Sequence, residues 1–133
     1  MKTVCCRLHR GDDLREKIEQ IAKEHDIAAG VVLSGVGCVS RARLRDASGV
    51  NVREIPEHCE IVSLNGTVSK TRCHIHIALS KEDLSTVGGH LMPGCIVNTT
   101  VELVIGILES MEYGVEQDLD TGYDEIVFRR SNA

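Results

Sequence analysis

Aromatic side chains are scarce in this chain of 133 residues, which has no tryptophan, two tyrosines and one phenylalanine. Proteins that bind single-stranded nucleic acid often stack bases on such rings. Clusters of lysine and arginine are missing too, and the formal net charge is −5. Because nucleic-acid binding normally needs basic surface to neutralise phosphates, direct nucleic-acid binding is not expected.

Long apolar runs are also missing, and none approaches the roughly 20 residues that span a bilayer. The first seven residues, MKTVCCR, have no apolar core typical of a secretory signal. A cytoplasmic protein without a membrane partner is therefore expected.

The six cysteines include no Cys-x-x-Cys pair. Reduced core thiols are predicted in place of a disulfide framework or a cysteine metal site.

The size and composition of the chain are those of a single domain covering residues 1–133, with 42% hydrophobic and 26% charged residues. Only residues 14–22 have clear helical periodicity. Asp12 or Asp13 is the predicted N-cap, and Asp13 with Glu16 makes a capping-box pattern. One main helix is expected to cover a sheet face.

Most of the remaining sequence has the β-branched content of strands. Gly35 and Gly37 predict a sharp turn within residues 31–45, and residues 46–57 predict a loop or weak hairpin. The fold class is therefore α+β, with a largely antiparallel sheet of about seven strands and one main helix packed on it. Such a sheet leaves apolar surface uncovered, so self-association is expected. The predicted strands are residues 3–9, two strands separated by the sharp turn within residues 31–45, and residues 59–68, 73–80, 95–108, 113–119 and 125–128, with a further strand starting at residue 86.

Three of the six histidines, His74, His76 and His90, lie close together in the sequence. In a strand, His74 and His76 would project from the same face, about 7 Å apart. If residues 81–85 form a five-residue hairpin loop, the antiparallel register places His90 directly opposite His76. A loop one residue shorter or longer would destroy this pairing. The pattern favours a shared metal ion, and ordinary surface or core histidines are the alternative.

Three arginines, Arg41, Arg43 and Arg45, alternate along one predicted strand. They would share one face of the sheet. A solvated sheet face is the favoured interpretation, and phosphate recognition is the alternative.

Several motifs taken together resemble the plants-and-prokaryotes conserved domain, known as the PPC domain. Their order and spacing match from about residue 3 to residue 128. They lie at residues 34–37 (SGVG), 60–66 (EIVSLNG), 74–76 (HIH), 88–91 (GGHL) and 94–97 (GCIV).

The resemblance implies a compact α+β fold that assembles as a homotrimer. It also implies a three-histidine metal site, which carries over onto His74, His76 and His90. In plant members the domain is attached to an AT-hook, a basic Arg-Gly-Arg-Pro element that enters the minor groove of DNA. The present sequence has no such element.

Neutral imidazoles suit zinc first, although another divalent transition metal could also bind. Three histidines leave a tetrahedral ion with one open position for water or a small ligand. The expected function is thus a metal-binding homotrimer that binds a small-molecule ligand or protein partner. A zinc-dependent hydrolase or lyase is an alternative, with Glu102 as a candidate proton acceptor that could equally form an ion pair at a subunit interface. A DNA-associated regulator acting through partners is the second alternative.

Overall fold

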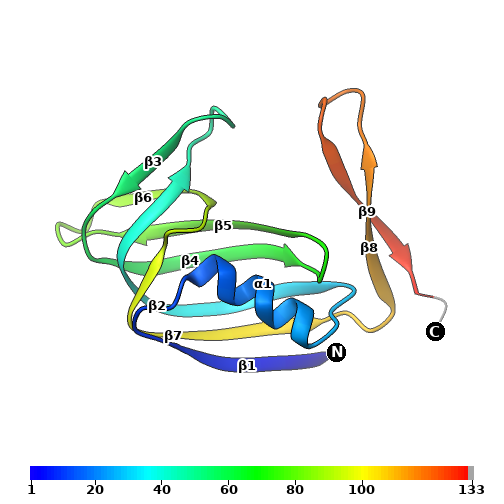
Figure 1. The fold of residues 1–133 in the computed structure, drawn as a ribbon, viewed down its shortest axis with the longest axis horizontal. Coiled ribbons are helices and arrows are strands. Elements are labelled where there is room, and N and C mark those ends of the chain that lie inside the picture. Colours follow the sequence, from blue (N-terminus) through cyan, green and yellow to red (C-terminus); the bar gives the residue numbers. More distant parts are fainter. Residues whose placement is uncertain (132–133) are drawn as a thin grey trace.

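The structure is a computed structural model that describes residues 1–131. These residues form one helix and nine strands. Figure 1 shows their arrangement. In chain order they are β1 (Lys2–His9), α1 (Leu14–Glu24), β2 (Gly30–Arg45), β3 (Val52–Ile55), β4 (Cys59–Val68), β5 (Cys73–Ser80), β6 (Thr86–Leu91), β7 (Ile96–Ile107), β8 (Met111–Gln117) and β9 (Asp124–Arg130).

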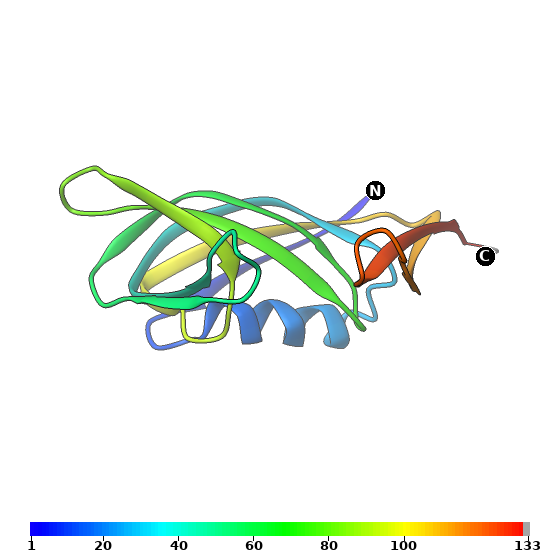
Figure 2. The same cartoon turned by 90° about the horizontal axis from the view of Figure 1, so that it is seen from above.

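Seven of these strands form one antiparallel sheet in the order β1-β7-β2-β4-β5-β6, with β3 paired to β2. The end of β2 also pairs with β6. Strands β8 and β9 form a separate two-stranded sheet, which stands to one side of the main sheet in Figure 1. Figure 2 shows α1 lying along one face of the main sheet. The predicted α+β class, with about seven strands and one helix, is confirmed.

The helix packs through the apolar face that the sequence predicts, and Ile18 and Ala22 are fully buried. Asp13 is its N-cap, because one carboxylate oxygen accepts a hydrogen bond from the backbone N–H of Glu16 at 3.1 Å. The other oxygen accepts from the backbone N–H of Gly94 at 2.7 Å. The Asp13 carboxylate therefore joins the start of the helix to the turn that precedes β7.

Strand β2 runs without a break from Gly30 to Arg45, so the predicted sharp turn is wrong. Its register against β7 shifts at three places, one of them between Gly37 and Cys38. A Cβ atom on Gly37 would overlap the carbonyl oxygen of Thr100. The glycine thus permits a close backbone contact at a bulge in one long strand, where the sequence pattern suggested a reversal.

Residues 46–57 form the weak hairpin that the sequence allowed, since β3 pairs with the end of β2.

All six cysteines are free, in agreement with the predicted reduced thiols, although Cys5 is exposed while Cys59, Cys73 and Cys95 are buried. Among residues 1–131 there is no helix with the length and apolar character needed to cross a bilayer.

Candidate metal centre

Strand β5 has the alternation that the sequence predicts. Ile75 and Ile77 are 0% and 3% exposed and belong to the core, whereas His74 and His76 are exposed. Because successive side chains of a strand point to opposite faces, burying the isoleucines forces both imidazoles to the other side. The hydrophobic pattern therefore positions the histidines.

The third imidazole comes from β6. Residues 81–85 form the loop, Ser80 pairs with Thr86, and His76 lies opposite His90. This register confirms the predicted one. The ring centroids are 4.9 Å apart for His74 and His76, 5.3 Å for His74 and His90, and 5.7 Å for His76 and His90.

One potential ligand atom from each of these three rings lies within 4.8 Å of the others. Around a tetrahedral zinc ion with Zn–N bonds of about 2.0–2.1 Å, ligand nitrogens are about 3.4 Å apart. Small rotations of the histidine side chains would bring the nitrogens from the observed separations of up to 4.8 Å to this distance. In addition, His90 Nδ1 is buried and has no hydrogen-bond partner among the described residues. The donor set therefore fits a divalent transition metal.

The surroundings of His74 and His90 favour the neutral imidazole, which is the form that binds a metal. Burial, followed by the charges of Arg45 and Arg15, lowers the pKa of His90 to about 4. Burial, followed by the charge of His76, lowers the pKa of His74 below its ordinary value. Both rings are therefore uncharged at neutral pH.

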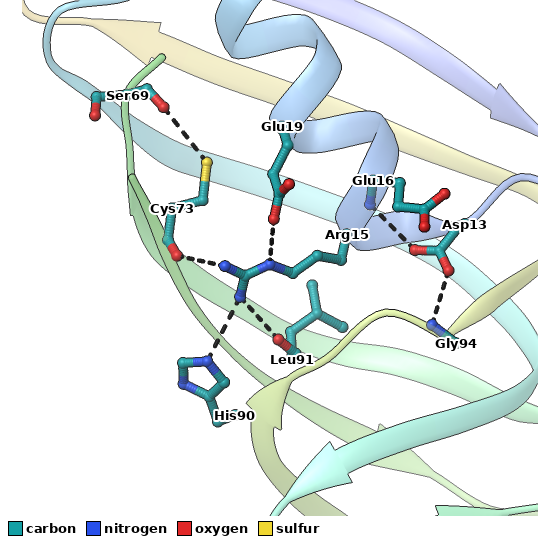
Figure 3. Close-up of polar contacts among 9 residues, drawn as sticks. All are labelled: Asp13, Arg15, Glu16, Glu19, Ser69, Cys73, His90, Leu91 and Gly94. Carbon is teal, nitrogen blue, oxygen red and sulfur yellow. Dashed lines mark hydrogen bonds and ion pairs between the residues drawn. The ribbon is translucent and has the colours of Figure 1, made fainter. Parts of the chain in front are cut away.

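Arg15 reaches His90 from the helix, as Figure 3 shows. Its Nη1 lies 3.5 Å from His90 Nε2 and donates to the carbonyl oxygen of Leu91 at 2.9 Å. Its Nη2 donates to the carbonyl oxygen of Cys73 at 2.7 Å, and its Nε pairs with Glu19 at 2.7 Å. A guanidinium only donates, so His90 Nε2 is the acceptor in the long contact. A metal on either nitrogen of His90 would end that contact, because Nε2 would then be ligated or protonated.

A cavity of about 360 Å³ adjoins the histidines. His74 and His90 line it together with Arg45, Arg72 and a segment at the start of β9. The sequence pattern favoured a solvated face for Arg45 and predicted no role for Arg72. The position of Arg72, two residues before His74, was an available signal, because alternate residues of an extended chain share a face. No such signal existed for Arg45, which joins the site because β2 pairs with β6 opposite His90.

Glu102 is exposed on β7, between Arg7 of β1 and Val36 of β2. Strands β2 and β4 separate β7 from the histidine strand, which corresponds to about 14 Å of strand spacing. The structure thus does not bring Glu102 to the histidines of its own chain, and a role at a subunit interface stays a prediction. The side-chain nitrogen of Asn98, also on β7, lies 3.3 Å from His58 Nδ1.

The profile of the Plants and Prokaryotes Conserved domain, abbreviated PCC or PPC, matches residues 1–109. The chain belongs to this family. The assignment agrees with the resemblance carried by the sequence motifs.

Solved structures share the PPC fold over nearly the whole chain. A hypothetical protein from Salmonella enterica is 30% identical, with a TM-score of 0.94 over 97% of this chain and 94% of its own. The protein AF0104 from Archaeoglobus fulgidus, described as metal-containing, is 31% identical, with a TM-score of 0.78 over 92% of this chain and 90% of its own.

A curated relative of this PPC domain is much longer. The bifunctional protein GlmU of Synechococcus sp. strain JA-2-3B'a(2-13) is 35% identical over 126 residues. These residues are 95% of this chain and 20% of the relative. The chain therefore spans about one fifth of that protein.

Proposed function

We propose that this PPC domain is a homotrimeric metal-binding protein that holds zinc, or another divalent transition metal, on His74, His76 and His90. Its open coordination position receives a small ligand or a protein partner. The observation that carries the proposal is the approach of three ligand nitrogens, from two strands, to within 4.8 Å of one another. The metal-containing relative from Archaeoglobus fulgidus supports it.

The chemistry of the donors favours zinc. Imidazole nitrogens suit zinc, and a site with three protein ligands has room for a fourth group, unlike a closed structural site. Zinc in such a site lowers the pKa of bound water towards about 7. The three histidines hold the ion. Burial lowers the pKa of His90 and so favours the neutral imidazole that binds a metal.

Self-association is supported by the sheet face that the helix leaves open. Leu33 and Val36 on β2 are 47% and 55% exposed, and Val62 on the adjacent β4 is 58% exposed. Exposed apolar side chains on neighbouring strands are typical of an interface between subunits. Light scattering coupled to size exclusion should give the mass of a trimer, and a Val36→Glu/Val62→Glu variant should give a smaller species.

The two alternative functions have weaker support. A hydrolase or lyase needs a proton acceptor beside the metal, and Glu102 lies several strands away in the same chain. A DNA-associated role has little support because the sequence contains no basic DNA-binding element and has a net charge of −5. The metal-binding function is therefore preferred.

Elemental analysis of the purified protein tests the metal site. Wild-type protein should contain about one transition-metal ion per chain, and His76→Ala/His90→Ala protein should contain almost none. The matched control is His9→Ala/His25→Ala, which removes two exposed histidines outside the cluster and should leave the metal content unchanged. Equal metal content in all three proteins would refute the site.

A further inference from the structure

Two arginines beside the histidine cluster have unused hydrogen-bonding capacity. Arg45 and Arg72 line the same cavity as His74 and His90. Arg45 Nε and Arg72 Nη1 are buried, and neither has a hydrogen-bond partner among residues 1–131. Buried polar groups are normally paired, and a buried guanidinium N–H without an acceptor is costly. Each therefore needs an acceptor that residues 1–131 do not supply.

Arg15 provides the contrast. It also contacts His90 but is fully engaged, because it pairs with Glu19 and donates to two backbone carbonyl oxygens. Its role is to hold the helix against the ends of β5 and β6. Arg45 and Arg72 have no ion pair of this kind within the described chain, although both carry a permanent charge.

The charges around the cavity also indicate what is missing. The lining contains two basic residues, Arg45 and Arg72, and two acidic residues, Asp124 and Glu125. These four charges balance. A divalent cation added to the histidines would leave a net charge of +2 in a partly buried site, where uncompensated charge is expensive. An anion bound beside the cation would restore the balance.

We propose that the open position of the metal site takes a small ligand bearing a carboxylate or phosphate group, which Arg45 and Arg72 bind through their guanidinium groups. This inference rests on the proposed function. A guanidinium matches both oxyanions with paired N–H donors. The cavity of about 360 Å³ is at the small end of ligand sites, about 300–1,000 Å³, so a small molecule fits better than a polymer.

Cation and anion should therefore bind cooperatively. Each reduces the electrostatic cost of binding the other, and linkage requires the enhancement of affinity to be the same in both directions. The zinc dissociation constant is the quantity to measure, by competition with a chromophoric chelator, in chloride buffer alone and with inorganic phosphate or acetate added. Micromolar zinc keeps zinc phosphate in solution.

For wild-type protein, at least one of the two anions should tighten zinc binding by about tenfold or more. Enhancement by phosphate alone assigns the site to phosphoryl ligands, and enhancement by acetate alone assigns it to carboxylates. Arg45→Gln and Arg72→Gln should bind zinc but lose the enhancement. Arg41→Gln is the matched control, because Arg41 is exposed on the same strand and does not line the cavity; it should behave as wild type.

The outcomes separate this inference from the proposed function. If wild-type protein binds zinc equally well with and without either anion, the oxyanion site is refuted and the metal site stands. If zinc does not bind under any condition, both are refuted. Should a glutamine variant fail to fold, the Arg45→Lys and Arg72→Lys variants replace it in the test. They keep the charge but lose the paired donors. An undiminished enhancement in both lysine variants would overturn the role of the guanidinium groups.

Discussion

His76 of β5 lies directly opposite His90 of β6 in the antiparallel ladder. The pairing depends on the five residues that connect the two strands, because the register of a hairpin follows the length of its loop. One residue more or fewer would turn one imidazole to the other face. The proposed metal site should thus be as sensitive to loop length as to its own ligands.

Deletion of Leu84 from this loop should abolish metal binding. Leu84 is 83% exposed and has a positive φ of 69°, so its removal costs little packing while it shifts the register. Elemental analysis should find less than about a tenth of the wild-type metal content in the folded protein. Leu84→Gly, which keeps the loop length and suits the positive φ, is the control and should retain full metal content.

Gly37→Ala should destabilise the protein strongly. The added Cβ would overlap the Thr100 carbonyl oxygen on the neighbouring strand, and backbone atoms of a central sheet cannot move far. We expect a loss of about 3 kcal/mol in the free energy of unfolding, measured by urea denaturation. Gly11→Ala is the comparison, because Gly11 also has a positive φ, but apart from Gly11 and its two chain neighbours no described residue has a heavy atom within 4 Å of the added carbon. It should cost about 1 kcal/mol, and equal losses in the two variants would contradict this account.

Asp13→Ala should remove both hydrogen bonds of the helix cap. The carboxylate accepts from the N–H groups of Glu16 and Gly94, so the variant loses the cap and the connection to the turn before β7. The free energy of unfolding, measured by thermal or urea denaturation, should fall by about 2 kcal/mol. Asp13→Asn keeps one acceptor oxygen and should lose about half as much. A loss for asparagine as large as that for alanine would show that the negative charge, and not the number of acceptors, is decisive.

Cys95 should make the protein less stable at alkaline pH. Its side chain is fully buried, and burial raises the pKa of its thiol to about 11 from an ordinary value of about 9. The folded state thus binds the proton more tightly than the unfolded state. The stabilisation is complete below about pH 9 and is lost as the pH rises towards 11, by about 2 kcal/mol.

Urea unfolding at pH 8.5 and pH 11 measures this contribution. The loss of stability between the two pH values should be about 2 kcal/mol smaller in Cys95→Ala than in wild-type protein. Cys5→Ala is the control, since Cys5 is exposed, and it should keep the wild-type dependence. The explanation fails if Cys95→Ala shows the same pH dependence as wild type.

The sequence was most informative where one physical rule decides the outcome. Strand alternation places His74 and His76 on the face opposite Ile75, because the isoleucines must be buried. The polar loop at residues 81–85 then determines which residue faces His76. The helix was equally accessible, since its apolar spacing and the Asp13 cap are local signals.

The incorrect and missed features depend on contacts between distant strands. Gly35 and Gly37 suggested a turn, but glycine serves both turns and close strand contacts, and only the position of Thr100 on β7 distinguishes them. The place of Glu102 required the strand order of the sheet. Arg45 required the pairing of β2 with β6, which no periodicity within either strand can indicate.

The amino-acid order by itself determined the α+β class, the helix and the three imidazoles on one hairpin face, because these follow from short-range periodicity and loop length. Only the tertiary structure decided what surrounds those imidazoles. Arg15, Arg45 and Arg72 come from a helix, a crossing strand and a connecting loop. The packing of the whole sheet brings them beside His90 and leaves Arg45 Nε and Arg72 Nη1 without a hydrogen-bond partner among residues 1–131.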